Sequence, residues 1–283
     1  MEFDLENPLP PSDDTFPLLF KMESDHMPAK TYSQSLDSKG SNRTIRSEIM
    51  SSISHFSGKF DPFLKYLAVN YMDRFLSTHS IPDGKLWIFD LVAIACVSLG
   101  LKMRKTEFSV SDLIQDGDFM FDSSTINRME LLILGALKWR MRSANPFCFL
   151  SYFITFVTFI DKYSVPNLKK RATEIILKAP NDVKLLEFKP SLISASALLC
   201  AVNEFFPVQF PSFKNAVCSC SYVDKEDFLQ CYDKIQGVAI EGCESLWALA
   251  LGSCTGQALQ DMSVVPSISG SKVDNNNNDG DNN

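Results

Sequence analysis

Apolar residues recur with the period of a helix face in the first half of the chain. From residue 64 to residue 76 the spacing is three or four positions, and Asp61-Pro62 precedes the run: Leu64, Leu67, Ala68, Tyr71, Met72, Phe75 and Leu76. Such spacing puts one apolar stripe on one side of a helix, and Asp followed by Pro is typical of a helix N-cap and first turn. The pattern predicts an amphipathic helix with one buried face.

The next predicted helix, from about residue 83 to residue 102, is apolar around most of its circumference. Its stretch from Leu91 to Val97 contains no polar side chain. A helix without a polar face must be surrounded by other helices. We therefore expect this segment to be the central helix of a bundle.

Further helical segments follow along the chain. A third helix is predicted from Asp122, a cap residue, to Leu137. The second half has helical patterns over 146–161, 166–178, 189–200 and 224–235, and strand patterns are scarce. Because 91–101 and 191–202 are both apolar and rich in small residues, the sequence indicates an all-α protein with a duplicated helical bundle.

Both ends of the chain differ in composition from this folded part. Residues 1–41 are rich in Pro, Ser and Asp without a sustained period, and residues 256–283 form an Asn-rich tail. We expect a disordered N-terminal arm and a disordered tail. The first twenty residues carry acidic side chains and no basic start before an apolar core, so we expect no signal peptide and an intracellular protein.

Composition narrows the class of partner. The formal net charge is −7 and the pI is about 5.1. Proteins that hold nucleic acid through phosphate contacts usually carry a clustered basic face, so we expect no nucleic-acid partner. The longest apolar runs are shorter than the ~20 residues that cross a bilayer, so we expect no membrane span. Another protein is the expected partner.

The residues of the usual catalytic and metal sites are missing. The sequence has no Gly-rich phosphate loop ending in Gly-Lys-Ser/Thr, no Gly-x-Ser-x-Gly and no His-Glu-x-x-His. His26, His55 and His79 lie far apart, and Cys218-x-Cys220 has neither the common two-residue spacing nor a second pair. We expect no enzyme activity, no catalytic residue, no cofactor and no metal.

One stretch resembles a known family. The segment from Leu67 to Ser77, Leu-Ala-Val-Asn-Tyr-Met-Asp-Arg-Phe-Leu-Ser, is similar to the second helix of the first cyclin box of plant D-type cyclins. Further segments match the family, and they come in the same order along the chain. They are Trp87, the run 92–99, Lys102-Met103, Arg128-Met129-Glu130-Leu131 and Leu137-Lys138-Trp139-Arg140-Met141. The resemblance covers about 42–255. It is closest to the divergent sixth subgroup, because Met103-Arg104-Lys105 stands where most plant D cyclins carry Met-Glu-Glu.

The resemblance implies a cyclin fold of two tandem helical bundles, an N-terminal box over 42–143 and a C-terminal cyclin-like domain over 144–255. It implies a nuclear regulatory subunit that binds and activates a cyclin-dependent kinase, at the G1-to-S transition or in a specialised developmental division. A retinoblastoma-related protein as substrate and kinase inhibitors are further implied partners. In the family, a lysine and a glutamate meet the kinase near its movable αC helix, and Lys102 and Glu130 are the matching positions.

Two departures from the family keep alternatives open. No cysteine precedes Cys96, so the Leu-x-Cys-x-Glu segment that docks on the retinoblastoma-related protein is absent. The first box helix, Arg46 to Ile53, has Ser51-Ser52 and no tryptophan, so we expect weak or altered binding of cyclin-docking peptides. A pseudo-cyclin that binds a kinase without activating it is therefore the main alternative. A cyclin-fold transcription factor would need basic faces and a metal ribbon, and an enzyme would need a catalytic constellation.

Overall fold

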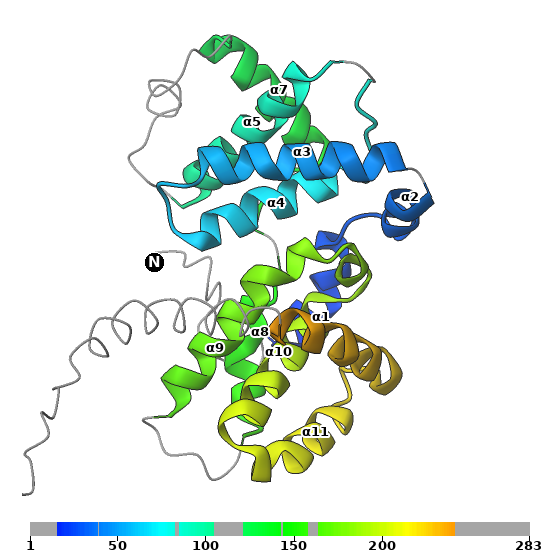
Figure 1. Cartoon of the computed structure of the whole chain (residues 1–283), viewed down its shortest axis with the longest axis vertical. Coiled ribbons are helices and arrows are strands. Elements are labelled where there is room, and N and C mark those ends of the chain that lie inside the picture. Colours follow the sequence, from blue (N-terminus) through cyan, green and yellow to red (C-terminus); the bar gives the residue numbers. More distant parts are fainter. Residues whose placement is uncertain are drawn as a thin grey trace, which may run out of the picture. The chain divides into compact units, whose positions relative to one another are not determined.

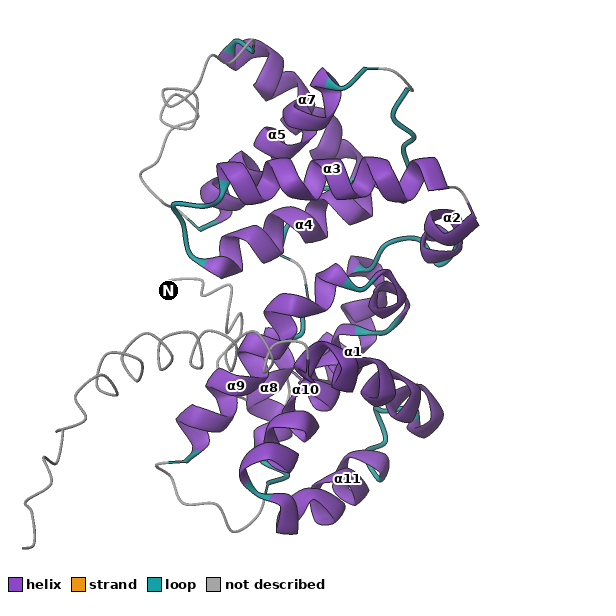
Figure 2. Ribbon diagram, in the orientation of Figure 1, coloured by secondary structure: helices purple, strands orange, loops and turns teal. Residues whose placement is uncertain are grey.

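The computed structural model describes residues 16–38, 40–82, 85–104, 121–142, 144–157 and 164–240. Within these ranges every regular element is a helix and no strand occurs, as Figure 2 shows. The all-α prediction is confirmed for this part of the chain. None of the helices described is both long and apolar enough to span a membrane.

The first bundle is built around α5 (Trp87–Met103). The helices α3 (Gly40–Phe56), α4 (Pro62–Leu76) and α7 (Ser123–Ala136) all pack against α5, as Figure 1 shows. Every residue of α5 from Leu91 to Leu101 is buried. The predicted central helix is confirmed, although it begins at Trp87 and not at residue 83.

Local sequence signals start the outer helices as predicted. The Asp61 carboxylate accepts hydrogen bonds from the backbone N–H groups of Phe63 (2.9 Å) and Leu64 (3.2 Å), at the first turn of α4. Asp122 accepts from the Thr125 N–H (2.9 Å) and caps α7. An N-cap side chain supplies acceptors to N–H groups that have no partner within the helix, so these two helix starts follow from sequence alone.

The approach of α4 to α5 depends on Gly100. A Cβ atom at this position would lie 2.7 Å from Cδ1 of Leu64. Because real Cβ contacts are essentially never this short, only glycine fits here without a shift of Leu64. The central helix is thus apolar along its length, and it carries a residue without a side chain where α4 crosses it.

The second bundle is built around α10 (Pro190–Phe205), whose residues from Pro190 to Val202 are all buried. It packs against α8 (Phe147–Ile154), α9 (Val165–Lys178) and α11 (Phe210–Cys218), with a further helix over 225–240. Short 3₁₀ helices connect them: η2 (Ala179–Asn181), η3 (Val183–Glu187) and η4 (Pro207–Gln209). The helix predicted over 146–161 ends at Ile154, and residues 158–163 lie outside the described ranges.

The N-terminal segment corrects one prediction. We expected disorder throughout 1–41, yet α1 (Phe16–Met22), η1 (Glu23–His26) and α2 (Tyr32–Ser38) are helical. The ring of Phe20 is buried, with its centroid 4.9 Å from that of Phe149 and stacked at 4.6 Å on Tyr222. This segment is ordered by distant partners and not by its own periodicity, so the prediction was wrong for 16–38. Residues 1–15 and the predicted tail, 256–283, lie outside the described ranges.

Glu23 fixes the N-terminal segment to the second bundle. Its buried carboxylate accepts hydrogen bonds from the backbone N–H (2.9 Å) and the hydroxyl (3.0 Å) of Ser191 in the first turn of α10. Burial raises the pKa of Glu23, while the two bonds from Ser191 partly offset this effect. A side chain 168 residues away in sequence thus supplies the acceptor that the start of α10 needs.

A buried ion pair connects α3, α4 and η2. Arg46 donates from Nε to Oδ1 of Asp73 (2.7 Å) and from Nη2 to Oδ2 (2.9 Å), and Nη2 also donates to the carbonyl of Pro180 (2.8 Å). The Tyr32 hydroxyl donates to Asp73 Oδ1 (3.1 Å). Burial alone would lower the pKa of Arg46, but the Asp73 carboxylate outweighs it, so the net direction is upward. The two side chains therefore satisfy each other's hydrogen bonds inside the protein.

Candidate functional site

The structure brings the two predicted site residues, Lys102 and Glu130, into contact. Lys102 lies in the last turn of α5 and Glu130 lies on α7, and Lys102 Nζ is 2.5 Å from Glu130 Oε2. The hydroxyl of Ser98 donates to the other carboxylate oxygen, Oε1, at 2.6 Å. Both oxygens of Glu130 are thus occupied by partners within the chain.

The two members of this pair differ in exposure. The side chain of Glu130 is 7% exposed, whereas that of Lys102 is 50% exposed. A buried carboxylate with two partners cannot easily turn outward, because it would leave both partners unsatisfied. Glu130 therefore fixes the position of the Lys102 ammonium, and the ammonium is the charge that the surface presents.

Sequence reasoning missed Ser98. It precedes Lys102 by four residues on α5, so both side chains lie on the same face of that helix. The hydroxyl of a serine in an otherwise apolar, buried helix needs a hydrogen-bond partner. That requirement could have marked Ser98 as a residue of the site.

Large apolar side chains are exposed on α7 and in the turn that follows it. Leu131, which follows Glu130 on α7, is 59% exposed, and Trp139, in the turn after α7, is 67% exposed. Single exposed apolar residues are common, but a tryptophan at this exposure is not. Tryptophan is enriched in protein–protein interfaces and among their energetically dominant residues, so Trp139 marks a candidate binding surface.

The turn that carries Trp139 has an unusual backbone. Lys138 (φ 52°) and Trp139 (φ 59°) both lie in the left-handed region that favours glycine. The Trp139 N–H donates to the Leu134 carbonyl (2.9 Å), which closes the end of α7 as in a Schellman motif. Neither residue is glycine, so this conformation needs support from its surroundings.

That support comes from α4 and η1. The Tyr71 hydroxyl donates to the Met141 carbonyl (3.0 Å), and Arg74 Nη1 donates to the Arg140 carbonyl (3.0 Å). Asp25 forms an ion pair with Arg140 at 2.9 Å. These contacts from α4 and η1 hold the segment 138–141 in place, and the side chain of Trp139 faces solvent.

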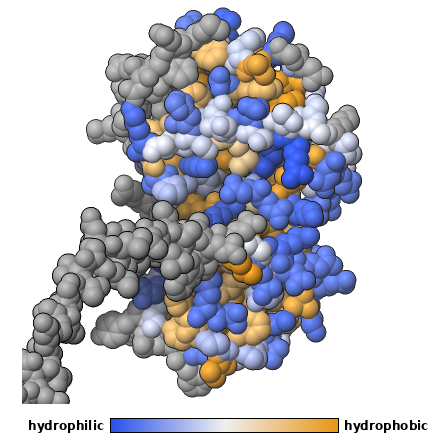
Figure 3. Space-filling model, in the orientation of Figure 1, coloured by the Kyte–Doolittle hydropathy of each residue, from blue (hydrophilic) through white to orange (hydrophobic). Residues whose placement is uncertain are grey.

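The face of α3 is polar where the family carries a tryptophan. Ser52 is half-buried and donates its hydroxyl to Asp90 Oδ1 on α5 at 2.6 Å, and Ser51 is exposed. Figure 3 shows hydrophilic and intermediate side chains along the surface occupied by α3. A serine bonded to a carboxylate offers no aromatic wall for an apolar peptide side chain.

Three buried cysteines, Cys96, Cys200 and Cys231, are poor candidates for nucleophiles. Burial raises the pKa of Cys96, and it raises the pKa of Cys200 and of Cys231 to about 12. A thiol with such a pKa stays protonated at neutral pH, and the thiolate is the reactive form. No group of three or more metal-ligating side chains is present among the residues that the structure describes.

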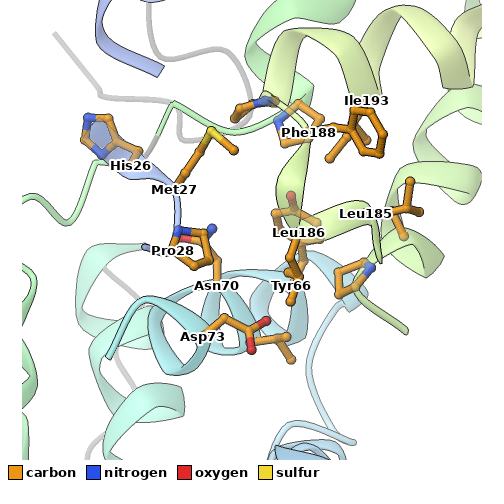
Figure 4. A pocket seen from close by; sticks show the side chains of 15 residues that line it. His26, Met27, Pro28, Tyr66, Asn70, Asp73, Leu185, Leu186, Phe188 and Ile193 are labelled. Carbon is orange, nitrogen blue, oxygen red and sulfur yellow. The ribbon is translucent and has the colours of Figure 1, made fainter. Parts of the chain in front are cut away.

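A cavity of about 60 Å³ lies between α4 and the segment 185–193. Figure 4 shows Tyr66, Asn70 and Asp73 on one side of it, with Leu185, Leu186, Phe188 and Ile193 opposite. Its acidic side chain, Asp73, already accepts hydrogen bonds from Arg46 and Tyr32. The carboxylate oxygens of Asp73 are thus already engaged by partners within the chain.

His26 is a buried structural histidine, and it predicts a pH dependence of stability. Burial and the positive charges of Arg74 and Arg140 lower its pKa to about 4, while Asp25 acts in the opposite direction. The unfolded chain binds a proton at this residue below about pH 6.5, and the folded chain does not until about pH 4. Stability therefore falls as pH drops through this window, by about 2 kcal/mol at pH 5 relative to pH 7.5.

Urea unfolding at pH 7.5, 6 and 5 tests this prediction, with His26→Gln as the matched variant. The difference in unfolding free energy between the two proteins is expected to shift by about 2 kcal/mol in favour of the variant at pH 5. Glu23 and the other titratable groups are common to both proteins, so they cancel in the difference. Equal pH dependence of the two proteins would contradict the assignment.

Comparison with known proteins agrees with this architecture. The chain matches the family model of the cyclin N-terminal domain over residues 14–142 and that of the cyclin C-terminal domain over residues 144–246. The first match begins inside the segment that we expected to be disordered. Among solved structures, a viral cyclin from herpesvirus saimiri matches with a TM-score of 0.54 and 22% identity, over 72% of this chain and 88% of that one. This likeness shows the fold.

Curated relatives are more similar in sequence. The chain is 45% identical over 252 residues to putative cyclin-D6-1 of Arabidopsis thaliana, with 83% of each chain covered. It is 33% identical over 261 residues to cyclin-D6-1 of Oryza sativa subsp. japonica, covering 89% of this chain and 78% of that one. Other D-type cyclins of both plants match at 32–38% identity. The chain therefore belongs to the D-type cyclins of plants.

Proposed function

We propose that this chain binds and activates a cyclin-dependent kinase and thereby promotes cell-cycle progression, at the G1-to-S transition or in a specialised developmental division. Membership in the D-type cyclin family supports a regulatory role toward such a kinase in the cell cycle. The proposal adds that the chain activates the kinase, that it acts at the stages named above, and that it is located in the nucleus.

The observation that carries the proposal is the ion pair between Lys102 at the end of α5 and Glu130 in the middle of α7. Glu130 holds the Lys102 ammonium in place, Leu131 next to Glu130 is exposed, and so is Trp139 in the turn after α7. A rigid charge beside apolar anchors suits a large protein interface, on the order of 2,000 Å² in signalling assemblies. The strained turn after α7 adds weight, because such strain persists where function depends on it.

Activation in this proposal is a population shift in the kinase. A helical surface that binds the kinase only with its αC helix held inward favours that conformer by its differential affinity. In that conformer the αC glutamate pairs with the active-site lysine and the activation loop opens. The cyclin contributes no catalytic group, in keeping with its role as a regulatory subunit.

Co-purification with a panel of plant cyclin-dependent kinases tests the proposal. The readout is phosphorylation of a fragment of a retinoblastoma-related protein, with the kinase alone as control. A stable one-to-one complex with raised kinase activity is the expected result. Binding without activity would instead support the pseudo-cyclin alternative, and no binding to any kinase of the panel would rule out the proposal.

Substrate recruitment is expected to differ from that of an ordinary plant D cyclin. Because Ser51-Ser52 cannot supply an aromatic wall, binding of a cyclin-docking peptide should be at least about tenfold weaker, which corresponds to one lost aromatic contact. Fluorescence anisotropy with a labelled docking peptide measures this, with an ordinary plant D cyclin as reference. Equal affinities for the two cyclins would contradict the prediction. If the docking peptide binds weakly as expected, the retinoblastoma-related protein, and kinase inhibitors as further proposed partners, would have to bind elsewhere on the complex.

A further inference from the structure

The Glu130 carboxylate spans one turn of α5. Its oxygens accept hydrogen bonds from two side chains of that helix: Oε1 from the Ser98 hydroxyl at 2.6 Å and Oε2 from the Lys102 ammonium at 2.5 Å. Residues four positions apart on a helix lie one above the other on the same face. The orientation of the carboxylate is thus set at two places, one inside the protein and one at its surface.

These two places differ in how firmly they are fixed. Ser98 is 2% exposed, and its side chain turns about a single bond, so the packing around α5 fixes the position of its oxygen. Lys102 is half exposed, and its ammonium ends a flexible four-carbon chain. The last torsion of a glutamate side chain has a broad energy minimum, so Glu130 does not select the orientation of its own carboxylate. Ser98 is therefore the rigid member of the three.

Loss of the Ser98 hydroxyl would remove the inner of the two constraints. Oε1 of Glu130 would lose this donor inside the protein, and a buried acceptor without a donor is strongly unfavourable. The carboxylate is then expected to turn, and the Lys102 ammonium either follows it or separates from it. In both cases the ammonium has to be immobilised when a partner binds, and that ordering lowers affinity.

We propose that Ser98 is a positioning residue for kinase binding, because it fixes the Lys102 ammonium through Glu130 before the kinase arrives. Ser98 is buried, so its effect on the kinase is indirect. The role rests on the proposed function, in which Lys102 contacts the kinase. It adds to Lys102 and Glu130 a third residue that the resemblance to the family did not indicate.

Equilibrium binding tests this role, with the plant cyclin-dependent kinase that binds the wild-type chain most tightly. Ser98→Ala is expected to raise Kd about two- to tenfold, the usual effect of having to immobilise one long side chain on binding. The change should lie mainly in the dissociation rate constant. Ser98→Thr keeps a hydroxyl donor at this position and should restore binding to within about twofold of the wild-type chain.

Cys96→Ala is the matched control for a loss of packing in the core. Cys96 is fully buried on α5, and this substitution removes one heavy atom, as Ser98→Ala does. Side chains two positions apart on a helix do not face the same side, so Cys96 points away from the face that carries Ser98 and Lys102. Cys96→Ala should lower the temperature of thermal unfolding and leave Kd unchanged.

A double-mutant cycle with Lys102→Gln separates positioning from a purely structural role. If Ser98 acts through the ammonium, Ser98→Ala should change Kd little once Lys102→Gln has removed that ammonium. Thermal unfolding checks that each variant is folded. Additive effects of the two substitutions, or a Kd of Ser98→Ala equal to that of the wild-type chain, would show that the positioning role is wrong while the proposed function stands. A wild-type chain that binds no kinase would overturn the proposed function itself.

Discussion

The substitution Asp73→Ala is expected to lower the free energy of unfolding by about 3–5 kcal/mol, because it leaves a buried guanidinium without its counter-ion. Arg46 is almost completely buried and directs Nε and Nη2 at the two oxygens of Asp73. Tyr32 would lose its acceptor in the same step. The remaining partner of Arg46 is the carbonyl of Pro180, which accepts one hydrogen bond and carries no charge.

Urea denaturation of the wild-type chain and the variant measures this loss. The matched control is the double substitution Arg46→Met with Asp73→Leu, which removes both charges and keeps apolar volume. It should recover much of the stability, because replacing a whole buried pair is often neutral. A loss below about 1 kcal/mol in Asp73→Ala would show that water or another group satisfies Arg46.

Exchange of the charges of Lys102 and Glu130 is expected to weaken kinase binding by about 2–5 kcal/mol, or roughly 30-fold to several thousand-fold in Kd. In the variant Lys102→Glu with Glu130→Lys, the half-exposed position presents a carboxylate in place of an ammonium. A kinase group that pairs with the ammonium would then face a like charge. Activation of the kinase should be lost together with binding.

This experiment needs a check on folding, since position 130 is buried and Ser98 loses its acceptor. Circular dichroism and thermal unfolding provide it. The single substitution Lys102→Gln keeps Glu130 and Ser98 in place, and it should weaken binding less than the exchange does. Unchanged binding of a folded double variant would place the kinase contact elsewhere on the chain.

The positions of the main helices could be predicted from sequence because their causes are local. The apolar spacing from Leu64 to Leu76 and the caps Asp61 and Asp122 act within a few residues, and α4 and α7 begin where those caps stand. The apolar circumference of α5 required surrounding helices, and it has them. The family followed from the same stretch of residues.

The candidate site was predicted only in part. The resemblance selected Lys102 and Glu130, but no pattern in the sequence indicates that they bind each other or that one is buried. The left-handed turn at Lys138 and Trp139 was not foreseen either, because neither residue favours that conformation. It depends on Tyr71 and Arg74, more than sixty residues away.

By itself the sequence determined the helical class, the starts of α4 and α7, the two central helices and the family, since each depends on spacing or motif within a short window. Only the tertiary structure decided that residues 16–38 form helices and not a disordered arm. The contacts of Phe20 with Tyr222 and of Glu23 with Ser191 hold this segment in place. The tertiary structure also decided which charges face solvent. The physical reason is that burial and pairing free energies depend on partners distant in the chain, which local periodicity does not encode.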